Sequence, residues 1–473
     1  MKLHLQNFGP IQDATIDLTR RIYVFVGYNN SGKTYLSQLI WSIFSEDTLQ
    51  RFAKKVTAVG EVKGELKLNE GLLEAVTAQF AEFMIQEILP EVFNDSRKEF
   101  LVNQDLALHF EFDAEAIAQL EVELHYPSLI SNGGLIKMVK AQGSLEIEAH
   151  NGVPATEQWI DCITRLLFHQ TIGQTPLFLP ANRIFFPAFY KYLFQLERED
   201  KQRMETEMSR LLRLLQSNTD ELQQALEAAL EAFQSPYTAP TNTLFNKMYE
   251  LNTHSVARDY YQDLLKVLSE LLGGEIVLHN VEGLGIVEFR LQLSKQTKEA
   301  QHLPMFLASS SANQLTTLFL YLKYWAEKHN NFLIIDEPEE NLHPGNQVQL
   351  SNLLLKFATQ HNNRILLNTH SPLMVENINN YVYLNILRKN TGQDVAKIIQ
   401  QNRLNLDPDI HLDPADLGVY FFRGGKVTDL QNESNDFGIH FRDFYKVSRE
   451  VSNTGKILTD YLDFADEEED LLD

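Results

Sequence analysis

The feature that most constrains the fold of this chain is a glycine-rich octapeptide between a predicted strand and a predicted helix. Residues 22–26 are continuously apolar, as in strands that are buried on both faces of a sheet. Residues 36–43 carry apolar side chains at helical spacing. Between them lies Gly27-Tyr28-Asn29-Asn30-Ser31-Gly32-Lys33-Thr34, which matches the pattern G-x-x-x-x-G-K-[ST]. A chance glycine-rich turn is the alternative, but the flanking strand and helix favour a phosphate-binding loop in an α/β fold.

The residue types in this phosphate loop (residues 27–34) suit the phosphates of a nucleotide. Glycines let the backbone wrap around phosphate groups, while successive N–H groups and the helix N-terminus supply positive potential. Lys33 is expected to reach the β- and γ-phosphates, and Thr34 to give an oxygen ligand to Mg²⁺. The predicted nucleotide-binding residues are Gly27, Asn29, Asn30, Ser31, Gly32, Lys33 and Thr34.

Two further apolar runs end in side chains that suit nucleotide hydrolysis. Residues 332–335 precede Asp336 and Glu337, which places both acids at the carboxyl end of a buried strand. Asp336 is expected to hold Mg²⁺ through water, and Glu337 to orient or deprotonate the attacking water. Residues 364–368 form another such strand and lead to His370, which could hydrogen-bond a γ-phosphate. A lone acid or histidine is usually structural, but together with the phosphate loop these residues favour an NTPase.

A serine-rich segment precedes an amphipathic helix near residue 318. Ser310 and Ser311 lie at the predicted start of that helix, where small hydroxyl side chains can form an anion site. An ordinary helix N-cap is the alternative, and the serines alone would favour it.

The order of these motifs resembles that of an ABC-type ATPase head. Three segments are similar in sequence to the RecF/OLD/SMC-related branch of these ATPases. They are NFGPIQDATIDL followed by VFVGYNNSGKT, IIDEPEENLHP, and NTHSPLMVENI. Within this branch, LASSSANQLTTLFLYLKYWAE looks most like the ATPase subunit of bacterial antiphage defence systems, of the Septu type or the retron-associated type. The resemblance covers residues 1–185 and 273–427.

This resemblance implies a mechanism in which two heads sandwich ATP between them. The phosphate loop of one copy would bind ATP and Mg²⁺, and hydrolysis would open a homodimer or a higher homo-oligomer. The implied roles are nucleotide binding in cis by Lys33 and Thr34, γ-phosphate contact in trans by Ser310 and Ser311, metal positioning by Asp336, general-base catalysis by Glu337 and γ-phosphate sensing by His370. Ala312 stands where such heads usually carry a glycine, which puts the strength of the contact in trans in doubt.

The patterns predict an α/β fold: an ABC-type P-loop NTPase head with a mixed central sheet, an antiparallel β-meander and an inserted α-helical subdomain. The meander is expected within residues 105–149, which alternate with period two, and Gly273 is expected to end the helical segment as a C-cap. Later strands are expected at residues 382–386, 396–399 and 419–422. The predicted division is an N-terminal lobe of the head (1–187), the helical insertion (188–272), a C-terminal lobe (273–427) and an extension with an acidic tail (428–473).

Composition narrows the classes of partner. Lys plus Arg number 41 against 64 Asp plus Glu, a net charge of −23, which argues against binding of nucleic acid or anionic membrane over the whole surface. The candidates for a local basic face are Arg51, Lys54 and Lys55. A single cysteine, Cys162, excludes an internal disulfide framework. Without a long apolar stretch or a cleavable N-terminal segment, the chain is expected to be cytoplasmic, with no membrane partner.

Asp407-Pro408-Asp409 imitates the paired acids of the Toprim nuclease that OLD proteins carry after such a head. Because the intervening proline disfavours a strand, we expect a loop of solvated aspartates and an ATPase without its own nuclease. The favoured function is an ATP-gated switch or scaffold that controls a separately encoded effector, such as a nuclease, in antiphage defence. The alternative is a DNA-repair or recombination ATPase that acts directly on duplex DNA.

Overall fold

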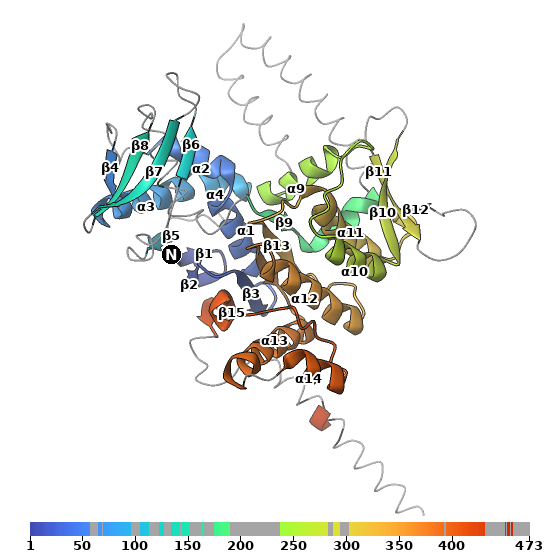
Figure 1. Cartoon of the computed structure of the whole chain (residues 1–473). Helices are drawn as coiled ribbons and strands as arrows, with labels where there is room; N and C mark the ends of the chain where they lie inside the picture. The colour runs from blue at the N-terminus through green and yellow to red at the C-terminus, as the bar shows by residue number, and fades with distance from the viewer. Residues whose placement is uncertain are drawn as a thin grey trace, which may run out of the picture.

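A nine-stranded mixed sheet organises the computed structural model (Figure 1). Its strand order is β5-β1-β2-β16-β15-β3-β14-β13-β9. The strands are β1 (Lys2–Phe8), β2 (Ile11–Asp17), β3 (Ile22–Gly27), β5 (Ala107–Glu111), β9 (Leu177–Leu179), β13 (Phe332–Asp336), β14 (Arg364–Asn368), β15 (Leu417–Arg423) and β16 (Lys426–Asp429). The structure describes residues 1–56, 65–68, 70–95, 105–112, 123–126, 134–141, 144–150, 163, 175–189, 237–281, 287–293, 302–391, 394–430, 450, 452–454 and 456.

The centre of this sheet is parallel and its flank is antiparallel. β15, β3, β14, β13 and β9 run parallel to one another, whereas β15 pairs antiparallel with β16, and β1 pairs antiparallel with both β2 and β5. β3, β13 and β14 are buried along their whole length, as their continuous apolar runs predict. The predicted α/β fold with a mixed central sheet is therefore confirmed.

Two hydrophobic cores, one on each face of the sheet, explain why the central strands are apolar throughout. In β3, Tyr23 and Phe25 pack into one core with α1, α2 and α3, while Ile22, Val24 and Val26 pack into the other with α9–α13. Successive side chains of a strand point to opposite faces, so each of these cores takes alternate residues. The helices are α1 (Lys33–Ile43), α2 (Glu46–Ala53), α3 (Glu70–Phe83), α4 (Leu89–Val92), α9 (Ala239–Tyr249), α10 (Gln262–Leu272), α11 (Ser310–Leu320), α12 (Pro344–Thr359), α13 (Pro372–Thr391) and α14 (Val395–Asn402), with π-helical turns at Met84–Ile88 and Tyr321–Trp325.

The predicted antiparallel meander exists, but its membership differs from the prediction. A separate four-stranded sheet has the order β4-β8-β7-β6 (Figure 1). The strand expected first in the meander, β5, instead pairs with β1 at the edge of the large sheet. Leu108 and Phe110 of β5 are buried, and the Phe110 ring lies 5.5 Å from that of Phe80 in α3. The strands of the smaller sheets are β4 (Glu65–Leu68), β6 (Glu123–Tyr126), β7 (Gly134–Ala141) and β8 (Ser144–His150), and β10 (Gly274–Asn280), β11 (Val287–Leu293) and β12 (His302–Pro304).

The described part of the predicted helical insertion belongs to the core of the head. Residues 190–236 lie outside the described residues. α9 and α10 follow them and bury Leu244, Phe245 and Leu268 in the same core as β3 and β13. Gly273, at a φ of 73°, ends α10 as the predicted C-cap. Cys162 and the acidic tail also lie outside the described residues.

Two of the three late strands are wrong. Residues 382–386 lie within α13 and residues 396–399 within α14, whereas the third prediction corresponds to β15. In α13 the buried side chains Met374, Ile378 and Tyr381 recur at helical spacing. The short apolar run at residues 382–386, which suggested a strand, is therefore part of a buried helix. Among the described residues, no helix is both long and apolar enough to cross a bilayer.

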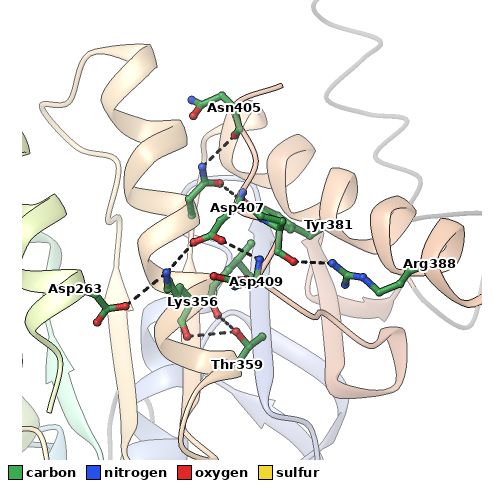
Figure 2. A network of polar contacts seen from close by, with 11 residues as sticks. Asp263, Lys356, Thr359, Tyr381, Arg388, Asn405, Asp407 and Asp409 are labelled. Atoms are coloured by element: carbon green, nitrogen blue, oxygen red, sulfur yellow. Dashed lines mark hydrogen bonds and ion pairs between the residues drawn. The ribbon is translucent and has the colours of Figure 1, made fainter. Parts of the chain in front are cut away.

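Asp407 is not the solvated side chain that the sequence predicts. Its carboxylate accepts a hydrogen bond from Lys356 Nζ of α12 at 2.9 Å, and its N–H donates to Tyr381 Oη of α13 at 2.8 Å (Figure 2). Lys356 also pairs with Asp263 of α10 at 3.6 Å. Asp409 is exposed, as expected, and its N–H donates to Asp407 Oδ1. Asp407 therefore anchors the segment after α14 to the helices beside it.

Candidate active site

The phosphate loop connects β3 to α1 at the carboxyl end of the central strands. Gly27 has a φ of 139°, and a Cβ there would clash with the carbonyl oxygen of Phe422 in β15. Gly32, at a φ of 98°, forms the N-cap of α1, which begins at Lys33. Asn29 and Asn30 are exposed at the tip of the loop. The backbone shape that only glycine adopts easily is thus required at both ends of the loop.

Lys33 points its side chain back over the loop. Its Nζ donates to the carbonyl oxygen of Tyr28 at 2.8 Å and lies 3.4 Å from that of Gly27. Burial lowers the pKa of Lys33, while the carboxylates of Asp336 and Glu337 act in the opposite direction. The amino group is therefore held close to the loop and close to negative charge.

Asp336 lies directly beside the loop. It ends β13 and is level with Asn368, which ends the neighbouring strand β14. Its Oδ2 accepts a hydrogen bond from Thr34 Oγ1 at 2.8 Å, and its Oδ1 accepts one from Asn368 Nδ2 at 2.9 Å. Ser37 Oγ donates in turn to Asn368 Oδ1 at 2.8 Å. Burial raises the pKa of Asp336, and the two hydrogen bonds partly oppose this rise.

Glu337 has a strained backbone. Its φ is 46°, in the left-handed region that non-glycine residues occupy at an energetic cost and that often marks functional sites. Its N–H donates to the carbonyl oxygen of Asn368 at 2.9 Å. The carboxylate is partly exposed and lies 3.8 Å from Nε2 of His370. The two predicted catalytic residues are therefore neighbours in space.

His370 is fixed by a carboxylate that sequence reasoning missed. Glu339 Oε1 accepts the backbone N–H of His370 at 2.6 Å, and burial raises the pKa of Glu339. Burial and the nearby Lys33 lower the pKa of His370, so its ring is neutral at pH 7. The only sequence signal for Glu339 is its place as the third acid of Asp336-Glu337-Pro338-Glu339.

A buried arginine, Arg183, lies beneath the two acids and was also missed. It belongs to a short 3-10 helix (Ala181–Ile184) that follows β9, and it is 3% exposed. Its Nη1 donates to the carbonyl oxygen of Asp336 at 2.6 Å, and its Nη2 to that of Glu337 at 3.2 Å. Burial lowers its pKa to about 10, so it stays charged at neutral pH. Because β9 and β13 are parallel neighbours, residues that follow β9 lie next to the acids.

The two predicted serines lie apart from this cluster. Ser310 is exposed and Ser311 is half-buried at the start of α11. The N-cap is Ser309, whose Oγ accepts the N–H of Ala312 at 3.2 Å and lies 2.9 Å from Ser311 Oγ. Within the described residues, the structure gives neither Ser310 nor Ser311 a hydrogen bond to the phosphate loop of the same chain.

Hard oxygen donors make the cluster suitable for a metal–nucleotide complex. A threonine hydroxyl and an aspartate carboxylate within hydrogen-bond distance of each other are ligand types that Mg²⁺ prefers. Backbone N–H groups at the N-terminus of α1 and the amino group of Lys33 are suited to phosphate. The structure thus brings together the loop, Asp336, Glu337 and His370, as the sequence predicts.

Several solved structures resemble the chain at low identity. The Smc head domain with an extended coiled coil, bound to the C-terminal domain of ScpA, from Pyrococcus furiosus is 13% identical, with 95% of this chain and 98% of that chain covered and a TM-score of 0.34. A SmcHead bound to the C-winged helix domain of ScpA is 14% identical, with 91% and 96% covered and a TM-score of 0.34. The SMC head domain from Thermotoga maritima is 10% identical, with 90% and 97% covered and a TM-score of 0.29.

A family model assigns the sequence more directly. No curated protein matches the chain. The model described as an AAA ATPase domain matches residues 1–131 and 182–375, which include the phosphate loop, Asp336, Glu337 and His370. These two segments make up more than half of the 473 residues. The chain therefore belongs to the family of AAA ATPase domains.

Proposed function

We propose that this protein binds ATP with Mg²⁺ and hydrolyses it. The observation that carries the proposal is the 2.8 Å hydrogen bond between Thr34 of the phosphate loop and Asp336. These two residues are 302 positions apart in the chain, and the carboxylate of Asp336 also interacts with the charge of Lys33. A hydroxyl from the loop, a carboxylate from a neighbouring strand and a lysine are the parts that nucleotide hydrolysis on a phosphate loop needs.

Each residue has a definite task in this reaction. Thr34 and Asp336 would hold Mg²⁺, which when bound neutralises negative charge on the phosphates. Lys33 would turn its Nζ from the carbonyl oxygen of Tyr28 to the β- and γ-phosphates. Glu337 would take the proton of the attacking water on its carboxylate. Neutral His370 would hydrogen-bond the γ-phosphate.

We further propose that ATP gates a homodimer or a larger homo-oligomer. Ser310 is exposed and Ser311 half-buried at the start of α11, and in the described residues neither has a hydrogen bond to its own phosphate loop. They are free to contact the γ-phosphate bound by a second copy, as the resemblance to ABC-type heads implies. Gln314, one turn further along α11, donates to the carbonyl oxygen of Glu337 at 3.3 Å. A nucleotide contact at the serines would therefore be linked through α11 to the catalytic Glu337 of the same chain.

The partner that we propose for this switch is a separately encoded effector protein, such as a nuclease, in cytoplasmic antiphage defence. The net charge of −23 disfavours direct wrapping of DNA. Two of the three cations considered for a DNA face are engaged in ion pairs: Arg51 lies 2.8 Å from Glu91, and Lys55 lies 2.5 Å from Glu87. A DNA-repair ATPase acting on duplex DNA is the alternative function.

Replacing the loop lysine tests the ATPase proposal. Calorimetric titration with ATP and Mg²⁺ should show binding to the natural chain and none to Lys33→Ala, because the side chain that neutralises the phosphates is removed. Lys54→Ala, which removes an exposed lysine outside the loop, is the matched control and should bind as the natural chain does. Micromolar binding by Lys33→Ala would refute the assignment of the site.

Co-expression separates the two proposed contexts. The chain and the product of the adjacent gene should together reduce phage plaque formation, and Lys33→Ala should remove this protection. Purified protein should show no tighter retention of duplex DNA with ATP than without it. ATP-dependent binding to duplex DNA, with no effect on phage, would favour the repair alternative.

A further inference from the structure

The backbone of Glu337 is held in its left-handed conformation by four hydrogen bonds. Its N–H donates to the carbonyl oxygen of Asn368 in β14 at 2.9 Å. Its own carbonyl oxygen accepts from Arg183 Nη2 at 3.2 Å, from Gln314 Nε2 at 3.3 Å and from the backbone N–H of Glu340 at 3.3 Å. A left-handed conformation at a glutamate persists only when its surroundings over-determine it. The groups that bond to the Glu337 peptide are therefore the ones that keep the strained backbone in place.

Arg183 directs its described hydrogen bonds to backbone carbonyl oxygens. Besides Asp336 and Glu337, its guanidinium donates to the carbonyl oxygens of Pro180 at 2.9 Å and Gln314 at 3.2 Å. A guanidinium that is 3% exposed loses most of its hydration, which is costly unless its fixed donors find partners. These donors connect three elements: the segment after β9, helix α11 and the end of β13.

We propose that Arg183 is a positioning residue for catalysis, which holds the Glu337 peptide in the left-handed conformation and so aims its carboxylate. This inference rests on the proposed role of Glu337 as the base in ATP hydrolysis. Without the bond from Nη2, the peptide of Glu337 can rotate towards an ordinary negative φ. The carboxylate then leaves its place 3.8 Å from His370. Misplacement of about 1 Å at a catalytic group costs up to about a hundredfold in rate.

A purely structural role for Arg183 makes different predictions. If Arg183 only stabilised the core, its loss would lower the unfolding midpoint and leave the turnover of the folded molecules unchanged. A positioning role lowers kcat while the affinity for ATP remains, because Lys33 and the phosphate loop do not contact Arg183 in the described hydrogen bonds. The split between kcat and affinity therefore separates the two roles.

Kinetics of Arg183→Gln and Arg183→Lys provide the first test. Arg183→Gln should lower kcat by about tenfold to a hundredfold with unchanged affinity for a non-hydrolysable ATP analogue. Arg183→Lys keeps the charge and part of the bonding, so its kcat should be intermediate. The matched control is Arg364→Gln, because Arg364 is also buried and donates to the carbonyl oxygens of Leu18 and Arg20. It should lose stability and keep its kcat.

A comparison of glycine and alanine at position 337 tests the conformational claim without nucleotide. With Arg183 present, Glu337→Gly should unfold at a higher temperature than Glu337→Ala, because glycine adopts a positive φ without strain. In the Arg183→Gln background the gap should shrink. Since no nucleotide is involved, the result stands even if the chain proves not to hydrolyse ATP. If Arg183→Gln does not fold, Arg183→Lys and Gln314→Leu take its place in both tests. A kcat in these variants equal to that of the natural chain would overturn the proposal. So would an unchanged difference in unfolding temperature between Glu337→Gly and Glu337→Ala.

Discussion

We predict a loss of stability on replacement of Asn368, and its magnitude follows from the hydrogen bonds of this side chain. Its side chain is fully buried between α1 and Asp336. Its Nδ2 donates to Asp336 Oδ1 at 2.9 Å, and its Oδ1 accepts from Ser37 Oγ at 2.8 Å. Replacement by alanine removes both bonds and leaves a buried carboxylate oxygen without that donor. A hydrogen bond to a charged group contributes about 1.5–3 kcal/mol and a neutral one about 1 kcal/mol. Asn368→Ala should therefore lower the free energy of unfolding by about 2.5–4 kcal/mol.

Urea unfolding of the nucleotide-free protein measures this loss. Ser37→Ala is the matched control, because it removes the Ser37 hydroxyl, which also lies 3.0 Å from the carbonyl oxygen of Lys33, and leaves the bond from Asn368 to Asp336 in place. The control should cost only about 1 kcal/mol. The difference between the two variants isolates the bond to the carboxylate. Equal losses in Asn368→Ala and Ser37→Ala would refute the reasoning.

The same loss should depend on pH in a defined direction. Burial already raises the pKa of Asp336 in the folded state, and the Asn368 amide opposes that rise. Without the amide the folded-state pKa rises further, so the variant binds a proton more readily than the natural protein does. The stability deficit of Asn368→Ala is thus fully present above the folded-state pKa of Asp336 and shrinks as the pH falls through it. A deficit that grows on acidification would contradict this assignment.

The remaining predictions concern Glu337 and assembly. Glu337→Gln should bind ATP as the natural chain does but hydrolyse it about 10²–10⁴-fold more slowly, because the amide cannot accept the proton. Single-turnover kinetics measure the rate. Turnover as fast as that of the natural chain would mean that another group is the base. With this slow variant and ATP, light scattering should report a dimer or a larger species, because in the proposed sandwich the phosphate loop and the serines Ser310 and Ser311 of one chain would contact different nucleotides. A strictly monomeric mass with ATP bound would refute the sandwich.

The centre of the fold and of the site could be predicted because local sequence carries it. The apolar run of β3 is followed by the phosphate loop, and the run of β13 by Asp336 and Glu337. Both runs are continuous because each strand is buried against two cores. Parallel strands that end at one edge of a sheet bring their terminal residues together, so His370 could be placed beside Glu337 from the sequence alone.

Other features depend on pairings that no local pattern reveals. Arg183 reaches Glu337 across 154 positions, and no periodicity marks a buried arginine whose bonds within the described residues go to backbone carbonyl oxygens. β5 alternates like a meander strand, and its choice of β1 as partner is decided by the core that Leu108 and Phe110 enter. In α13 a short apolar run suits a strand or a buried helix equally well. Long-range packing decided each of these cases.

The energetically unfavourable groups of the structure lie in the same site as the sequence motifs. Burial raises the pKa of Asp336 and of Glu339 and lowers that of Lys33, so all three charged groups are held where their charged forms are disfavoured. Glu337 adds a strained backbone. A fold selected only for stability would avoid such groups, whereas functional sites commonly contain them. The raised pKa values of the two carboxylates reduce the stability of the folded protein at neutral pH. This loss shrinks as the pH falls through their folded-state pKa values and is gone below their unfolded-state values. In the proposed function, a bound metal–phosphate complex would supply opposite charge to Lys33 and Asp336 and so offset part of these costs.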